Sequence, residues 1–157
     1  MLPRRRVASF ALRLLWSRLV SSEEVPMLRG GCFCGAIRYE ADGAPFHETS
    51  CHCSICRRTT GAPFVTWFSM DSRALRIVKG QPLRFNSTEK GTRSFCQHCG
   101  TQLTFEHADF PGEIDVTTCS LDEPNLLPPR DNTHTSSRVS WIRPDGLPEY
   151  AQSRTNR

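Results

Sequence analysis

The sequence has no uninterrupted hydrophobic run long enough to span a bilayer, few helix signals and no internal repeat. The first twenty residues are partly apolar, but Arg13 and Arg18 interrupt them, and no small-residue cleavage site follows. We therefore expect no membrane association and no secretory signal. Without a secretory route, the thiols are expected to stay reduced.

Charge of one sign is also scarce in most of the chain. The 157 residues carry a formal net charge of +4, of which residues 1–26 supply +3 through five arginines and two glutamates. The remaining chain has 15 basic and 14 acidic side chains. A surface that binds a phosphate backbone needs a concentration of positive charge. We therefore expect no nucleic-acid partner, and the sequence does not indicate an oligomeric state.

The basic segment 1–26 is treated as an N-terminal extension with three interpretations. Its arginines, its serines and the absence of acids before Glu23 suit a mitochondrial presequence. A disordered or loosely helical tail and a mis-assigned start codon are the alternatives. The last is favoured, because Met27 directly precedes the first cysteine motif. We expect one domain over residues 27–150, a polar tail over 151–157 and a cytoplasmic protein, or a mitochondrial one if the presequence is genuine.

Cysteine, in contrast, is abundant, with eight residues. Seven of them form three clusters: GGCFCG (Cys32, Cys34), CHCSIC (Cys51, Cys53, Cys56) and FCQHCG (Cys96, Cys99). In a reducing compartment such spacings indicate metal ligands rather than disulfides. The eighth, Cys119, stands alone in an expected strand and is interpreted as a packing residue.

The spacing within each cluster favours convergence of the sulfurs on one ion. In an extended C-x-C both side chains lie on the same face, and in C-x-x-C a tight turn brings them together. Zinc prefers four tetrahedral ligands, and thiolate is one of the favoured types. The seven cysteines divide most naturally into a closed set of four (Cys32, Cys34, Cys96, Cys99) and an open set of three (Cys51, Cys53, Cys56). Three protein ligands leave a position for water or substrate, which is typical of a catalytic zinc.

Two alternatives remain open at this stage. One is a single zinc ribbon made of Cys53, Cys56, Cys96 and Cys99. It would leave the other three clustered cysteines without a metal. In the other alternative His52 completes the open site and makes it structural, although an extended chain would turn His52 away from its neighbours.

The remaining pattern predicts a mainly β fold of short strands with irregular connections. AIRYEA alternates, with Ile37 and Tyr39 on one face, and similar short runs recur up to EIDVTTC. One short helix is expected around SICRRTTG, ended by Gly61. The final WIRPDGLPEY is expected to dock through Trp141, Leu147 and Tyr150. Strands this short make a modest core, which metal cross-links would reinforce.

Three motifs in register then identify a family resemblance. GGCFCGAIRYE, SCHCSICRRTTGAPF and FCQHCGTQL, followed by SSRVSWIRPDGLPEY, resemble the glutathione-dependent formaldehyde-activating enzyme family, also called the CENP-V/GFA domain. The resemblance covers roughly residues 28 to 150. It implies an Mss4-like β-tent with two zinc ions, one structural at the closed set of four cysteines and one catalytic at the open set of three.

The resemblance also implies an activity. The family joins formaldehyde to glutathione as S-(hydroxymethyl)glutathione, which in reverse is a carbon–sulfur lyase reaction. The implied partner is thus a small thiol, glutathione or its adduct, which is thought to approach the three-cysteine zinc. The alternative is a zinc-stabilised binding module of the same fold without turnover.

Other candidate residues carry weaker signals. Arg57 and Arg58 follow the last cysteine of the open set and either attract the glutathione carboxylates or form a solvated basic pair. His98, which lies within FCQHCG, is expected to be a surface group or to support a ligand rather than to bind metal itself. Three histidines outside the clusters, His47, His107 and His134, are expected to be solvated or hydrogen-bonded, with His134 the one that could approach a site. The aromatic residues Phe64, Trp67 and Phe68 are expected in the core, although one of them could wall the pocket.

Overall fold

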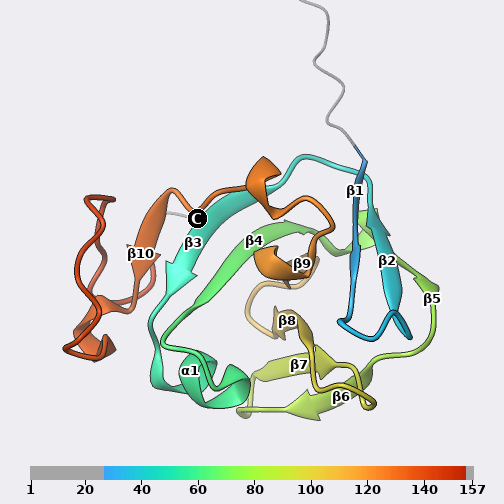
Figure 1. The fold of residues 1–157 in the computed structure, drawn as a ribbon, viewed down its shortest axis with the longest axis horizontal. Helices are drawn as coiled ribbons and strands as arrows, with labels where there is room; N and C mark the ends of the chain where they lie inside the picture. Colours follow the sequence, from blue (N-terminus) through green and yellow to red (C-terminus); the bar gives the residue numbers. More distant parts are fainter. Residues whose placement is uncertain (1–26, 155–157) are drawn as a thin grey trace, which may run out of the picture.

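The computed structural model describes residues 27–154 as two β-sheets with one short α-helix (Figure 1). The mainly β fold class is thereby confirmed, and it is consistent with the expected β-tent. Segment 1–26 and the last three residues lie outside the described residues, so the interpretations given for that segment stay predictions. Within the described range, no helix has the length and apolar character needed to cross a membrane.

The two sheets differ in size. The smaller has the strand order β1 (Leu28–Gly31), β2 (Arg38–Ala41) and β5 (Leu75–Lys79). The larger has the order β10 (Asp131–Thr133), β3 (Phe46–Cys51), β4 (Val65–Asp71), β9 (Glu113–Thr117), β8 (Gln102–His107), β7 (Gly91–Phe95) and β6 (Leu83–Asn86), and it is strongly curved (Figure 1). Neighbouring strands are antiparallel except for β10, which joins β3 in parallel.

The short connections include one α-helix and several 3₁₀ turns. The predicted helix is present as α1 (Ser54–Thr60), and it ends at Gly61, whose φ of 69° is in the left-handed region that favours glycine. The 3₁₀ turns are η2 (Ser72–Ala74), η3 (Thr118–Ser120), η4 (Pro124–Leu126) and η5 (Thr135–Ser137). Helix α1 directly follows the cysteines at the end of β3, so it fixes the local path of that segment.

The main core lies between the two sheets. The predicted alternation is confirmed in β2 and the residue before it, because Ile37 and Tyr39 are both buried. They join the same apolar cluster as Phe68 of β4 and Leu103 of β8. The Tyr39 hydroxyl lies 2.7 Å from the Ser120 hydroxyl, which links the small sheet to η3. Burial raises the pKa of Tyr39 to about 12, so this phenol stays protonated.

The C-terminal segment docks differently from the expectation. Trp141 is 66% exposed and Tyr150 is also exposed, so the docking by aromatic side chains was wrong in those two cases. The segment is instead held through its backbone. The Asn132 N–H donates to the Pro148 carbonyl at 2.9 Å, and the Tyr150 N–H donates to the Asn132 carbonyl at 2.8 Å. These bonds continue the edge of the larger sheet beyond β10.

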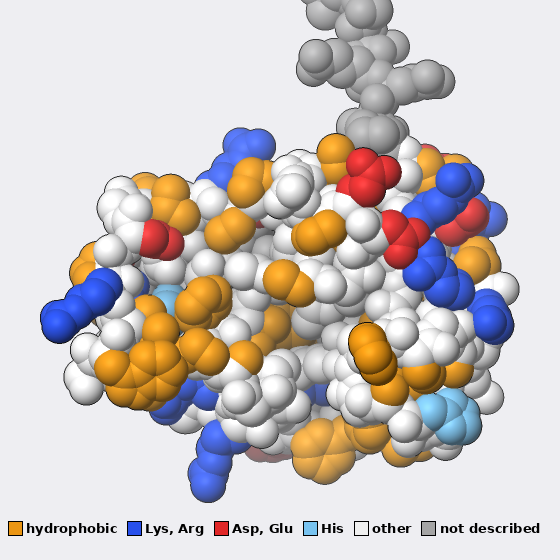
Figure 2. All heavy atoms as spheres, in the orientation of Figure 1, with side chains coloured by type: hydrophobic (Ala, Val, Ile, Leu, Met, Phe, Trp, Pro, Cys, Tyr) orange, Lys and Arg blue, Asp and Glu red, His pale blue; other side chains and the backbone are white. Residues whose placement is uncertain are grey.

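The surface agrees with the modest charge of this part of the chain. On the face shown in Figure 2, lysines and arginines are scattered, and several lie beside acidic side chains. Pairs of this kind include Arg38 with Asp122 and Arg76 with Glu40. Exposed pairs of opposite charge add little stability, but they cancel each other's field.

The buried Tyr39–Ser120 contact yields a stability prediction. Tyr39→Phe should lower the free energy of unfolding by about 1 kcal/mol, because a buried hydrogen bond is lost while the ring still packs. Urea unfolding at constant metal concentration measures the change. Tyr150→Phe is the matched control, since that ring is exposed, and it should change stability by much less. Equal effects of the two substitutions would contradict the role of the buried bond.

Candidate metal centres and active-site pocket

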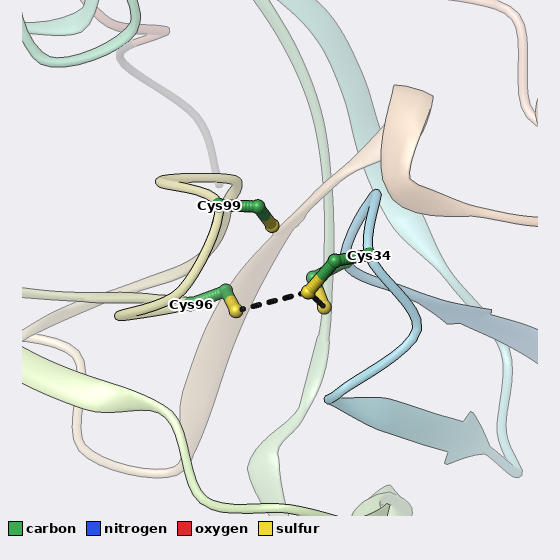
Figure 3. Close-up of side chains that lie close together, drawn as sticks. Cys34, Cys96 and Cys99 are labelled. Atoms are coloured by element: carbon green, nitrogen blue, oxygen red, sulfur yellow. Dashed lines mark hydrogen bonds between the residues drawn. The ribbon is translucent and has the colours of Figure 1, made fainter.

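Four cysteines converge from two turns that are distant in sequence, one in each sheet. Cys32 and Cys34 lie between β1 and β2, and Cys96 and Cys99 lie between β7 and β8. All four sulfurs lie within 4.8 Å of one another. The Cys32 and Cys34 sulfurs are 3.5 Å apart, and those of Cys34 and Cys96 are 3.8 Å apart. Figure 3 shows Cys96 and Cys99 facing Cys34 across the gap between the turns.

Tight turns produce this convergence. The Gly35 N–H donates to the Cys32 carbonyl at 3.0 Å, and the Gly100 N–H donates to the Cys96 carbonyl at 2.8 Å. Both glycines have positive φ, 71° and 75°, which other residues rarely adopt. The repeated flanking glycine of the cysteine motifs is thus a requirement of the turns.

Hydrogen bonds favour the thiolate form at two of these sulfurs, those of Cys32 and Cys99. The Ile37 N–H donates to the Cys32 sulfur at 3.2 Å. Hydrogen bonds from the Thr101 hydroxyl and backbone lower the pKa of Cys99 to about 5. The Phe33 N–H donates to the same Thr101 hydroxyl, so one threonine ties both turns together. Donors aimed at sulfur stabilise the charged form that binds metal.

The donor set fits a thiophilic metal ion. Tetrahedral zinc with bonds of about 2.3 Å to sulfur requires thiolates roughly 3.8 Å apart. The separations of 3.5 and 3.8 Å are close to that value. The set of four therefore could hold one ion, and its composition is compatible with zinc.

Three further cysteines form a separate group, here called the cysteine trio: Cys51, Cys53 and Cys56. Cys51 ends β3, Cys53 caps the N-terminus of α1 and Cys56 lies inside that helix. Their sulfurs also lie within 4.8 Å of one another. The division into four and three is thus the one in the structure, and the zinc-ribbon grouping is wrong because Cys96 and Cys99 converge with the other pair.

His52 does not join the trio. Its ring is buried, and Nε2 lies 2.8 Å from Oδ1 of Asn132 on β10. The ring also packs against Phe64 at 5.1 Å between centroids. As expected for an extended segment, His52 turns toward the sheet edge while the cysteines on either side of it converge.

Close approach makes the three sulfurs unequal. Hydrogen bonds from Cys51 and Cys56 lower the pKa of Cys53 to about 2. The same contact with Cys53 raises the pKa of Cys51. Three thiols this close cannot all ionise without a cation, because like charges repel and burial adds a desolvation cost. The trio therefore could hold a metal ion through three thiolates, with fewer protein donors than zinc prefers.

A pocket of about 690 Å³ opens beside the trio. All three trio cysteines line it, whereas none of the four cysteines of the other group does. Trp67 and Phe105 form part of its wall, so the expectation that one aromatic residue walls the pocket applies to Trp67. Phe68 is fully buried in the core. A pocket of this volume accommodates a small organic molecule.

Three histidines also line the pocket: His47, His107 and His134. His134, on the turn after β10, lies near Cys53. His47 and His134 have φ of 53° and 54°, a left-handed conformation that residues other than glycine seldom adopt. His98 is exposed, as expected. Local sequence patterns could not predict that His47 and His107 line the trio's pocket, because long-range strand pairing brings them there.

Sequence reasoning also missed Arg93, a pocket residue on β7. Its side chain is 5% exposed, and its Nη2 donates to the Cys56 sulfur at 3.6 Å. Arg57 and Arg58, which the sequence suggested for anion binding, do not line the pocket. Strand alternation could have predicted that Arg93 is buried. Arg93 and Gly91 are two residues apart in β7, so both lie on the same, buried face of the strand.

The geometry agrees with the comparison to known proteins. Residues 27–137 match the family described as "Glutathione-dependent formaldehyde-activating enzyme". The chain belongs to this family. The matched range contains all seven clustered cysteines and every strand of both sheets.

Individual relatives are more distant. A protein of Halomonas elongata, named "Putative glutathione-dependent formaldehyde-activating enzyme", is 28% identical over 126 residues, which cover 74% of this chain and 80% of that protein. An uncharacterised lyase of Schizosaccharomyces pombe is 29% identical over 85 residues, covering 54% of this chain and 61% of that protein. A crystal structure of a Rhodobacter sphaeroides protein has a TM-score of 0.48 and 21% identity, covering 78% of this chain and 98% of that one.

The eighth cysteine lies apart from both groups. Cys119 was expected to pack in a strand, but it lies in η3 and is exposed, so that expectation was wrong. Its sulfur lies 3.5 Å from the Thr66 hydroxyl. This position makes Cys119 a suitable control for the other cysteines.

Metal content tests the two groups separately. We expect two equivalents of a divalent metal per chain by mass spectrometry of the purified protein. Cys56→Ser should lose one equivalent and keep its circular dichroism spectrum. Cys99→Ser should lose the other and fail to fold stably, because a structural site of this kind contributes ~10 kcal/mol to folding.

Cys119→Ser is the matched control and should retain both equivalents and full stability. A wild-type protein with a single equivalent, or a Cys56→Ser variant that retains both, would contradict two independent centres.

Proposed function

We propose that the protein catalyses the reversible joining of formaldehyde and glutathione, which in reverse is a carbon–sulfur lyase reaction. The observation that carries this proposal is the cysteine trio opening into a pocket of about 690 Å³ in a chain of this family. The four-cysteine group is proposed as a structural zinc site, because it is away from the pocket and closes its own donor set. The trio is proposed as the catalytic zinc site.

The shape and chemistry of the pocket support a thiol substrate. Aromatic rings of Trp67 and Phe105 line it together with polar side chains, among them Ser69 and Asp115. An extended peptide-like molecule could place apolar atoms against the rings and polar atoms against hydroxyl and carboxylate groups. The trio then receives the substrate's sulfur.

A zinc ion held by Cys51, Cys53 and Cys56 would stabilise a substrate thiol as thiolate. The chain's own residues orient and enclose that sulfur. Cys56 is held by α1, Cys51 by the last pair of β3 with β4, and Cys53 by the N–H of Cys56, which donates to its sulfur at 3.2 Å. Because all three cysteines line the pocket, a further ligand of an ion held there would come from the pocket.

The reaction needs the removal of one proton and the formation of one bond. The glutathione thiol loses its proton to water or to a basic side chain in the pocket. The thiolate sulfur then attacks the carbon of formaldehyde, and the adduct oxygen takes up a proton, which balances the one released. Positioning the two reactants in one pocket supplies acceleration by proximity.

Isotope exchange between labelled formaldehyde and S-(hydroxymethyl)glutathione tests the activity, since the adduct also forms in water without a protein. We expect the wild-type protein to accelerate exchange measured by NMR well above the uncatalysed rate. Cys56→Ser should abolish the acceleration while the fold is kept, because the open donor set is broken.

Cys119→Ser should exchange at the wild-type rate, which controls for unspecific thiol chemistry. If the wild-type protein leaves the exchange rate at its uncatalysed value, the enzyme proposal is wrong, and a zinc-stabilised binding module for the thiol or its adduct remains.

A further inference from the structure

The guanidinium of Arg93 lies buried beside the cysteine trio. Its Nη2 donates to the Cys56 sulfur at 3.6 Å, and its Nε donates to the Ser87 hydroxyl at 3.2 Å. Its carbon Cζ lies 4.6 Å from the centroid of the Phe105 ring and 5.7 Å from that of Trp67. The group is therefore fixed by contacts on its faces and on its edge.

The third nitrogen of the Arg93 guanidinium, Nη1, makes no hydrogen bond to another described residue. Nη1 is buried and has no hydrogen-bond partner among residues 27–154. Within the same range Arg93 forms no ion pair with a carboxylate, whereas the poorly exposed Arg138 and Arg154 pair with Glu149 and Asp131. A buried N–H donor of a cation without an acceptor is costly unless a ligand supplies one.

We propose that Arg93 binds the adduct oxygen of the substrate and stabilises its negative charge as the carbon–sulfur bond forms. This inference rests on the proposed function. The contact with Cys56 places the guanidinium next to the sulfurs that the substrate thiol joins. The oxygen of a hydroxymethyl adduct is two covalent bonds from that thiol's sulfur. The carboxylates of glutathione lie much further along the tripeptide, so they fit this position less well.

The electron balance of the step identifies where a cation is needed. A lone pair of the thiolate sulfur forms the new bond to carbon, and the carbon–oxygen π pair moves to oxygen. The resulting alkoxide accepts hydrogen bonds from Arg93 until it takes a proton from water. Arg93 itself keeps all its protons, because a guanidinium remains charged throughout the accessible pH range.

The rigidity of the group makes this stabilisation effective. Donors that are already fixed at the position of developing charge need no reorganisation when the charge appears. Stacking on Phe105 and the bond to Ser87 fix the plane of the guanidinium before a ligand enters. Its burial also keeps water from weakening the interaction.

Two stable glutathione derivatives of equal shape test the assignment by calorimetry. S-(carboxymethyl)glutathione carries an anionic oxygen near the sulfur, and S-(carbamoylmethyl)glutathione carries a neutral amide in the same place. We expect the wild-type protein to bind the anionic derivative roughly tenfold to a hundredfold more tightly, as for a charge-assisted hydrogen bond.

Arg93→Gln should bring this ratio close to one, and Arg93→Lys should give an intermediate ratio because it keeps the charge without the planar fork. Arg84→Gln removes the same charge at an exposed position outside the pocket and should keep the wild-type ratio. Circular dichroism and metal content establish that each variant is folded. If Arg93→Gln does not fold, the wild-type ratio and Arg93→Lys still decide the result.

The outcomes separate this assignment from the proposed activity. A wild-type ratio near one, or no binding of either derivative, overturns the role of Arg93, and so does a full wild-type ratio in Arg93→Gln. Accelerated isotope exchange without the binding preference overturns Arg93 alone. A preference that depends on Arg93 but comes without accelerated exchange supports the oxyanion site and overturns the enzymatic activity.

Discussion

The convergence of four thiols from two distant turns is the constraint on which the rest of the structure depends. Cys34 and Cys96 are 62 positions apart in sequence, yet their sulfurs lie 3.8 Å apart. A cross-link that closes so long a segment removes much of the freedom of the unfolded chain. A metal ion bound by all four thiols would also join the smaller sheet to the β7–β8 end of the larger one. A domain of short strands would gain from this joint stability that its modest core does not supply.

The cysteine trio, unlike the four-cysteine group, comes from a single short segment of the chain. Cys51, Cys53 and Cys56 come from one continuous stretch, so a metal ion there closes only a few residues and adds little to the joining of the sheets. Its ligands are positioned instead by the end of β3 and the start of α1. A metal ion there would not be needed to join the sheets, so it would be free to keep a coordination position open, which favours the trio as the catalytic site of the proposed function.

Local features of this fold could be predicted from the sequence, whereas features set by strand pairing could not. The turns around Gly35 and Gly100 and the end of α1 at Gly61 depend on neighbours in the chain, and all were predictable. Arg93 and His134 reach the trio only through the pairing of β7 with β6 and β8 and the parallel addition of β10 to β3. Single-sequence patterns do not specify such register.

Strand β7 runs from the pocket to the four-cysteine group, so the two groups of cysteines are linked through one strand. Arg93 contributes to the pocket, and three residues later Cys96 belongs to the four-cysteine group. Whatever holds Cys96 in place therefore also fixes the guanidinium beside Cys56. A lysine would present a mobile point charge, but the planar fork of arginine can contact the cysteine sulfur and an adjacent oxygen together. A metal ion bound by the four-cysteine group would thus also influence how accurately the pocket presents its buried positive charge.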